Sequence, residues 1–122
     1  MLHNISKMDM ANVGSGLGFK DAVEQHTEGV LEGFGIVEFD RVNVETGELE
    51  TVNISVVKVD GKLFSGASKV VEGRLKNLDA IVGNSRDVED KRISVKFEKI
   101  KLAKGDGTNL IVTRYDEDMM SV

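Results

Sequence analysis

The side chains of this chain best placed for chemistry are cations at alternate positions of one predicted strand, Arg92–Lys104. The residues that we expect to face inward are Ile93, Val95 and Phe97. A change of alternation after Phe97 then gives one outward row of Arg92, Lys96, Lys99 and Lys101. Cations at such positions lie about 6–7 Å apart, close to the phosphate spacing of an extended nucleic-acid strand. The pattern predicts a surface that follows a phosphate backbone.

Charge is unevenly distributed along the chain. Its 16 Lys and Arg residues are outnumbered by 21 Asp and Glu residues, which gives a net charge of −5. Residues 91–114 nevertheless carry seven cations and two acids, a net of +5, whereas residues 36–50 carry five acids and one cation, a net of −4. A negative chain argues against binding to polyanions only when its charge is evenly spread. The further cations that we assign to the candidate nucleic-acid surface are Lys58, Lys62, Lys91 and Arg114.

Aromatic side chains that could stack on bases are few, because the chain has five Phe, one Tyr and no Trp. Three of them fit core positions better than exposed ones, namely Phe34, Phe39 and Phe97. Phe64, in a short glycine-flanked strand, and Tyr115, near the end of the last strand, are the better candidates for stacking. If neither stacks, binding would be mostly electrostatic and strongly salt-dependent.

Other kinds of chemistry have little support in the sequence. The absence of cysteine excludes disulfides and thiolate metal sites. His3 and His26 lie in segments without clear periodicity and mark neither a metal site nor a Ser–His pair. The alternating Gly14, Gly16 and Gly18 lack the preceding strand and the following Lys-Ser/Thr of a phosphate loop, so they indicate a hinge. We therefore expect no catalytic residue, no metal site, no cofactor and no enzyme activity.

Five predicted strands and one helix must position the cations. The strands are Phe34–Val44, Leu49–Val59, a short strand beginning at Lys62–Phe64, Arg92–Lys104 and Asn109–Tyr115. Apolar residues at three- and four-residue spacing predict a helix over Ser65–Gly83, with Ser65 as N-cap and Gly83 as C-cap. Asp60-Gly61 signals a two-residue hairpin, and Gly105–Gly107 are expected to turn the chain. This order predicts a mainly β fold, a five-stranded OB-fold-like antiparallel barrel with one helix between strands three and four.

The predicted barrel domain spans residues 19–115, between an arm and a tail. Residues 1–18 are expected to form a flexible glycine-rich arm, Phe19–Leu31 a short helix, and residues 116–122 an acidic tail. The first ten residues lack the cationic start and apolar run of a signal peptide, and no segment approaches the roughly 18 apolar residues of a membrane span. We therefore expect a soluble cytoplasmic protein with no membrane partner.

The strand–helix order and the tail YDEDMMSV together resemble the small single-stranded DNA-binding proteins of bacteria and their phages. The order covers most of the chain, but it is a topology and not a motif. The tail departs from the bacterial pattern, because it ends in Ser121-Val122 and not in an apolar Pro-Phe pair. The resemblance implies a protein that coats single-stranded DNA without sequence preference during replication or recombination, in a bacterial host if it is phage-encoded. It also implies that the acidic tail recruits replication or recombination proteins.

Two alternatives stay open beside this hypothesis. Outward lysines are common on exposed strands, where they protect sheet edges from aggregation, so the cationic row could be a solvated face. The acidic segment and the glycine-rich arm favour a structural or protein-interaction β-barrel module, in a virion or a regulatory complex, without nucleic-acid binding. Because one small OB domain covers only about 4–16 nucleotides, coating a strand favours a homodimer or a higher oligomer.

Overall fold

The computed structural model of the chain describes residues 2–14, 16–82, 88 and 92–115. The strands within them are β1 (Leu2–His3), β2 (Leu17–Gly18), β3 (Glu28–Val42), β4 (Leu49–Val59), β5 (Lys62–Gly66), β6 (Ile93–Leu102) and β7 (Gly105–Tyr115). The helices are α1 (Lys7–Ala11), α2 (Phe19–Glu24) and α3 (Lys69–Val82). No helix in this described part is long and apolar enough to cross a membrane.

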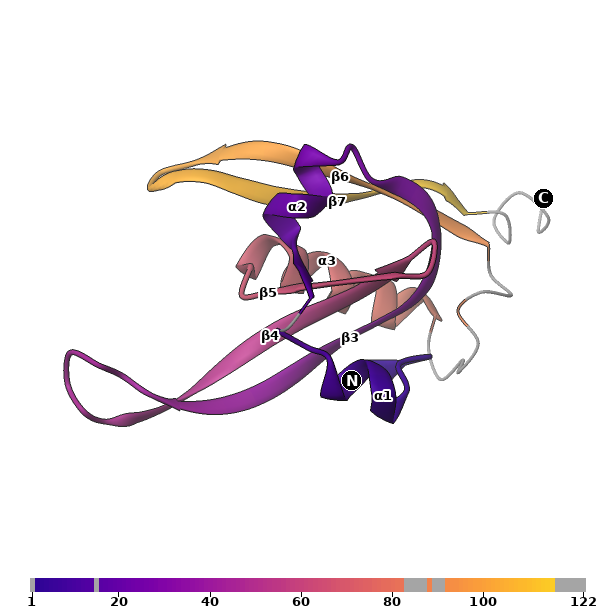
Figure 1. The fold of residues 1–122 in the computed structure, drawn as a ribbon. Helices are drawn as coiled ribbons and strands as arrows, with labels where there is room; N and C mark the ends of the chain where they lie inside the picture. Colours follow the sequence, from indigo (N-terminus) through magenta and orange to yellow (C-terminus); the bar gives the residue numbers. More distant parts are fainter. Residues whose placement is uncertain (1, 15, 83–87, 89–91, 116–122) are drawn as a thin grey trace.

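The strands form one curled sheet in which β3 belongs to two halves (Figure 1). Their order along the sheet is β2-β5-β4-β3-β6-β7, and β1 pairs with β3 outside this path. The first residues of β3, Glu28 to Val30, pair with β6, whereas Leu31 to Val42 pair with β4. A register shift between Leu31 and Gly33 marks the point where the strand changes neighbours. The sheet thus curls into a half-barrel, which confirms the predicted mainly β fold.

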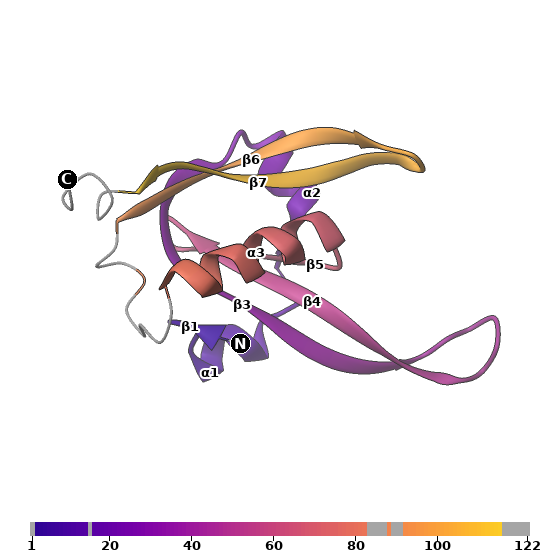
Figure 2. The ribbon, with the colours of Figure 1, turned by 180° about the vertical axis from the view of Figure 1, so that it is seen from behind.

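Helix α3 lies between the β3–β4 pair and the β6–β7 hairpin (Figure 2). Its buried stripe consists of Val71, Leu75, Leu78 and Val82, at the three- and four-residue spacing of one helix face. The Ser68 hydroxyl accepts a hydrogen bond from the Val71 N–H at 3.2 Å, so Ser68 caps the helix. The expected N-cap, Ser65, instead belongs to β5 and pairs with Val56. The expected C-cap, Gly83, lies outside the described residues.

Other predicted boundaries differ from the structure in ways that matter for the site. Strand β4 has the predicted bounds, but β3 begins at Glu28 and not at Phe34, because α2 ends at Glu24. Asp60 and Gly61 have φ angles of 50° and 75°, as a two-residue type I′ turn requires, so this hairpin prediction is confirmed. The glycines from 105 onward belong to β7, and the chain turns instead at residues 103–104.

The core fills the space between the curled sheet and the helices. The Phe97 ring lies at its centre, with its centroid 5.8 Å from that of Phe19 in α2 and 5.3 Å from that of Phe64 in β5. Ile93 and Val95 are buried together with Phe97, as the alternation predicts. The three aromatic rings therefore join α2, β5 and β6 across the inside of the half-barrel.

Residues 2–18 contain β1, α1 and β2, although we expected an arm without regular elements. Beside β1, an added Cβ at Gly33 would lie 2.6 Å from a backbone oxygen of the arm, so only glycine permits this approach. His3 is buried, its ring stacks on Phe34, and its Nε2 lies 2.6 Å from Asp79 Oδ1 of α3. The expectation was wrong because pairing with the sheet, which local sequence does not show, stabilises these short elements.

Candidate nucleic-acid interface

Two long hairpins project from the same end of the molecule in both views (Figures 1 and 2). We call residues 38–53, the outer part of β3 and β4 with their turn, the acidic hairpin. We call residues 93–115, which comprise β6 and β7, the basic hairpin. The acidic hairpin carries five acids and one cation, a net of −4, and the basic hairpin carries five cations and two acids, a net of +3. The charge separation predicted from sequence is therefore displayed on two projections at the same end of the molecule.

The cations of β6 do not share one face, contrary to the prediction. Pairing of β6 with β7 is continuous from Val95 to Leu102, so side chains alternate without a slip over this stretch. Lys99 and Lys101 therefore lie on the same face as the buried Phe97, and Lys96 lies on the opposite face. The declining burial along β6 reflects a regular strand that leaves the core.

The register irregularity lies elsewhere in the hairpin. Ser94 pairs with Arg114 and Val95 pairs with Val112, so the additional residue is Thr113 of β7. An extra residue in one strand is a β-bulge, which increases the local twist. The bulge therefore bends the root of the basic hairpin and leaves the alternation at its tip intact.

The face of the basic hairpin that carries Phe97 continues beyond the core as a cationic surface, which we call the inner face. Lys99 Nζ lies 3.1 Å from Asp106 Oδ2, across the hairpin. Lys101 is exposed on the same face, and Lys104 is exposed in the turn. Neither of these two has a hydrogen bond or an ion pair to another residue of the described part. Three lysines at the tip, with one acid among them, thus form the cationic end of this projection.

Three predicted site residues lie near the root of the basic hairpin or outside the described residues. Arg92 is exposed and has a φ of 50° just before β6. Arg114 is exposed and lies opposite Ser94, at the end of β7 remote from the turn. Lys91 lies outside the described residues. The structure therefore separates Arg92 and Arg114 from the tip lysines along the length of the hairpin.

Lys58 and Lys62 lie on strands of the other half of the sheet. Lys58 Nζ lies 3.5 Å from Asp9 Oδ2 of α1, and Lys62 Nζ lies 3.4 Å from Gln25 Oε1. Burial opposes the charged form of Asp9, but hydrogen bonds from Ser6 and the Lys58 charge outweigh it and lower the Asp9 pKa. The carboxylate therefore stays ionised beside Lys58, and the two predicted cations are engaged within the chain.

Phe34 and Phe97 are buried as predicted, but the other aromatic residues named in the prediction differ from it. Phe64 is fully buried against Phe97, so it has no face for a base. Tyr115 packs against the core at the end of β7 remote from the turn. Phe39, expected in the core, is 41% exposed, because regular pairing of β3 with β4 places it on the strand face opposite to the buried Phe34. None of these rings lies at the tip of the basic hairpin, so the structure does not bring the predicted stacking residues to the cations.

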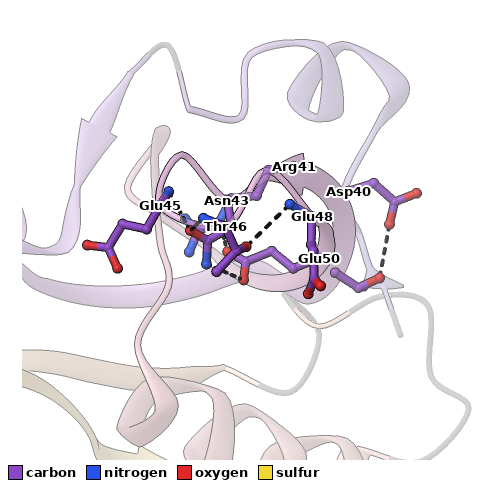
Figure 3. Close-up of polar contacts among 8 residues, drawn as sticks. Asp40, Arg41, Asn43, Glu45, Thr46, Glu48 and Glu50 are labelled. Atoms are coloured by element: carbon purple, nitrogen blue, oxygen red, sulfur yellow. Dashed lines mark hydrogen bonds and ion pairs between the residues drawn. The ribbon is translucent and has the colours of Figure 1, made fainter.

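The tip of the acidic hairpin is ordered by its own polar groups (Figure 3). Arg41 Nε donates to Glu50 Oε1 at 2.7 Å, and Asn43 Oδ1 accepts from the Glu45 N–H at 2.9 Å. The Glu48 N–H donates to Thr46 Oγ1 at 3.3 Å. The hydrogen bond from Arg41 is the largest cause of a lowered Glu50 pKa. The only cation of this hairpin is therefore occupied by one of its own acids, and the surface remains acidic.

The positions of Lys104 and Phe39 differ from those predicted from the sequence. Lys104 was counted at the end of a strand, but it occupies the two-residue turn, where its side chain is exposed. The short distance in sequence between Leu102 and Gly105 is a signal that could have located this turn. Phe39 lies an odd number of residues from the buried Phe34 in a regularly paired stretch of β3, so its side chain is on the opposite face of the strand.

The described residues hold no group of three or more His, Asp and Glu side chains arranged to bind a metal ion. Comparison of the chain with models of known protein families, with curated proteins and with solved structures gave no match in any of the three. The function of the protein is therefore inferred from the arrangement and charge of the two hairpins.

Proposed function

We propose that this protein binds single-stranded DNA, without sequence preference and without catalysis, through the inner face and tip of the basic hairpin. The residues that contact phosphates are Lys99, Lys101 and Lys104. The protein would act on strands exposed during replication or recombination. The observation that carries the proposal is that the basic hairpin and a second hairpin project from the same end of a curled five-strand path.

The order of the main strands supports an OB-fold as part of this proposal. The path β5-β4-β3-β6-β7, with α3 between β5 and β6 in the chain, is the strand order of an OB barrel opened between its third and fifth strands. In that fold the loops after the first and fourth strands flank the oligonucleotide. The acidic and basic hairpins occupy these two places in the chain. The two-residue strands β1 and β2 are additions to the five-strand pattern.

The charge of the basic hairpin supports contact with phosphates and not with bases. Lys101 and Lys104 have no partner in the described part, so binding to a phosphate breaks no ion pair. The tip of the basic hairpin, residues 99–108, contains no aromatic ring, and stacking therefore adds little. Binding should be weak to moderate and strongly salt-dependent, because its favourable term is the release of counterions from the strand.

A fluorescence anisotropy titration of labelled oligo-dT tests the proposal at two salt concentrations. We expect binding at about 50 mM salt and a preference over duplex of the same length. The double variant Lys101→Ala/Lys104→Ala should lower the salt slope by about 1.4, which is two contacts at about 0.7 each. The matched control is Lys7→Ala/Lys20→Ala, which removes the same charge from two exposed lysines of the helices. An equal decrease in salt slope for the Lys101/Lys104 variant and the Lys7/Lys20 control, or equal affinity of the wild-type chain for duplex and oligo-dT, would contradict the proposal.

The acidic hairpin favours a second candidate function, a protein-interaction module without nucleic-acid binding. Its tip exposes apolar side chains among the acids, with Val44 96% exposed and Leu49 69% exposed. Exposed apolar groups with a charged rim are typical of protein-binding surfaces. A protein that ignores oligo-dT at low salt would favour this alternative.

A further inference from the structure

We infer that the acidic hairpin is a docking surface for the basic hairpin of a second copy of this chain. The inference concerns a different partner from the proposed function and does not depend on it. Its starting point is that each hairpin has the charge that the other lacks, −4 on one and +3 on the other. Opposite patches of this kind steer and orient association.

The tip of the acidic hairpin exposes apolar side chains to water. Val42 and Leu49 pair across the two strands and are 61% and 69% exposed, and Val44 in the turn is 96% exposed. The Glu45 carboxylate points away from the network of the tip (Figure 3). A small apolar centre with an acidic rim fits a partner that has apolar side chains surrounded by cations.

The basic hairpin provides such a partner surface. Leu102 is 47% exposed at its tip, where it lies over Gly107, since an added Cβ at Gly107 would be 2.5 Å from Leu102 Cδ1. Lys101, on the opposite face of β6, and Lys104, in the turn, have no partners in the described part. One face of the tip thus offers an apolar side chain to the apolar residues of the acidic tip, and its other face and turn offer ammonium groups to the carboxylates.

The placement of the two hairpins predicts how two copies meet. Both project from the same end of the molecule (Figures 1 and 2). When two copies approach end to end about a twofold axis, each acidic hairpin faces the basic hairpin of the other copy. One contact therefore makes both complementary pairs, and the assembly closes as a dimer without growing into a filament.

Charge reversal distinguishes this dimer from other associations. Glu45→Lys/Glu48→Lys changes two carboxylates that make no side-chain hydrogen bond in the described part, because only backbone atoms of these residues are bonded. Lys101→Glu/Lys104→Glu changes two cations without partners. The first variant brings the acidic hairpin from −4 to 0, and the second brings the basic hairpin from +3 to −1, so two copies of either variant lose the attraction between their hairpins. In a mixture, the basic hairpin of the first variant (+3) again faces an acidic hairpin of −4 on the second.

Sedimentation velocity without nucleic acid provides the test. We expect the wild-type chain to be dimeric at about 50 mM salt and to dissociate at about 1 M, where charges are screened beyond about 3 Å. Each double variant should raise the dimer Kd at least about tenfold, and the two variants in an equimolar mixture should associate more tightly than either one alone. The control Lys20→Glu/Glu24→Lys, on exposed positions of α2, should leave the Kd unchanged.

Three results would overturn the inference. The first is a wild-type chain that stays monomeric at low salt. The second is a dimer that neither double variant weakens, which would place the interface elsewhere. The third is a mixture of variants that does not recover association. Because no nucleic acid is present, failure here leaves the oligo-dT titration unaffected, and the two proposals can fail separately. A monomeric chain that binds oligo-dT would assign the basic hairpin to nucleic acid alone.

Discussion

The acidic and basic hairpins are built alike at the root and differ at the tip. Each begins in the core, where its alternate residues are buried, and each runs on regularly after the core ends. At the acidic tip, Arg41 is bonded to Glu50 and the turn is held by Asn43. At the basic tip, only Lys99 has an ion pair, and Lys101 and Lys104 have none in the described part. The same scaffold thus supports one tip whose only cation is paired with its own acid and one tip whose lysines are available to an anion.

The largest difference should come from the aromatic residue of each hairpin. Phe97, at the root of the basic hairpin, is 2% exposed, and Phe39 in the acidic hairpin is 41% exposed. Phe97→Ala should lower the free energy of unfolding by about 3–5 kcal/mol, because it leaves a cavity among packed rings. Phe39→Ala should cost about 1 kcal/mol or less, as is usual for an exposed position. Urea unfolding of both variants measures this, and equal losses would contradict the assignment of core and projection.

The root of the acidic hairpin contains a buried polar group, and its removal should give the next largest change in stability. The Ser55 hydroxyl is fully buried and has no hydrogen-bond partner in the described part of the chain. Ser55→Ala should therefore raise the free energy of unfolding by about 1 kcal/mol, because the unfolded state no longer gives up a hydrated hydroxyl on folding. Thermal and urea unfolding measure the change. A clear destabilisation would show that the hydroxyl has a partner after all.

The ion pair of the basic hairpin offers a smaller change in binding. Asp106→Asn removes the carboxylate that lies 3.1 Å from Lys99 Nζ and leaves a side chain of the same shape. We expect oligo-dT to bind about 2–5 times more tightly, which corresponds to about 0.4–1 kcal/mol, the range of an exposed ion pair. Anisotropy titration at low salt measures the gain. Lys99→Ala in the Asp106→Asn background should remove it.

The smallest effect concerns Glu50 in the acidic hairpin. The hydrogen bond from Arg41 lowers the Glu50 pKa, so it should titrate below an ordinary glutamate, and Arg41→Ala should raise its pKa again. A lowered pKa in the folded state gives stability that is present above the unfolded pKa and is lost as the pH falls through the folded one. The stability change should be small, because the carboxylate is exposed to solvent. An NMR titration of Glu50 in both chains gives the two pKa values directly.

Local sequence was sufficient for the elements that local interactions determine. The bounds of β4, the Asp60-Gly61 turn and the apolar stripe of α3 agree with the structure, because alternation, turn geometry and helical spacing each act over a few residues. The mainly β fold follows from the same signals.

The site was harder to predict, because exposure depends on where the core ends. The apolar residues Ile100 and Leu102 after Phe97 suggested a change of alternation, whereas β6 continues regularly and leaves the core. Phe64 is buried because Phe97, far along the chain, packs against it. Lys58 is engaged because Asp9 of α1 lies beside it. Contacts between distant segments decide these three outcomes, and no short stretch of sequence contains them.

The central claim is that one face of the basic hairpin binds single strands, and two lysines of the same strand test it most directly. Lys101 lies on the inner face and Lys96 on the opposite one, and both are exposed. Each alanine variant removes one charge from β6, so net charge is matched. Titration of labelled oligo-dT at several salt concentrations should show a slope lowered by about 0.7 for Lys101→Ala and an unchanged slope for Lys96→Ala. Equal changes in both variants, or a change for Lys96→Ala alone, would contradict the claim.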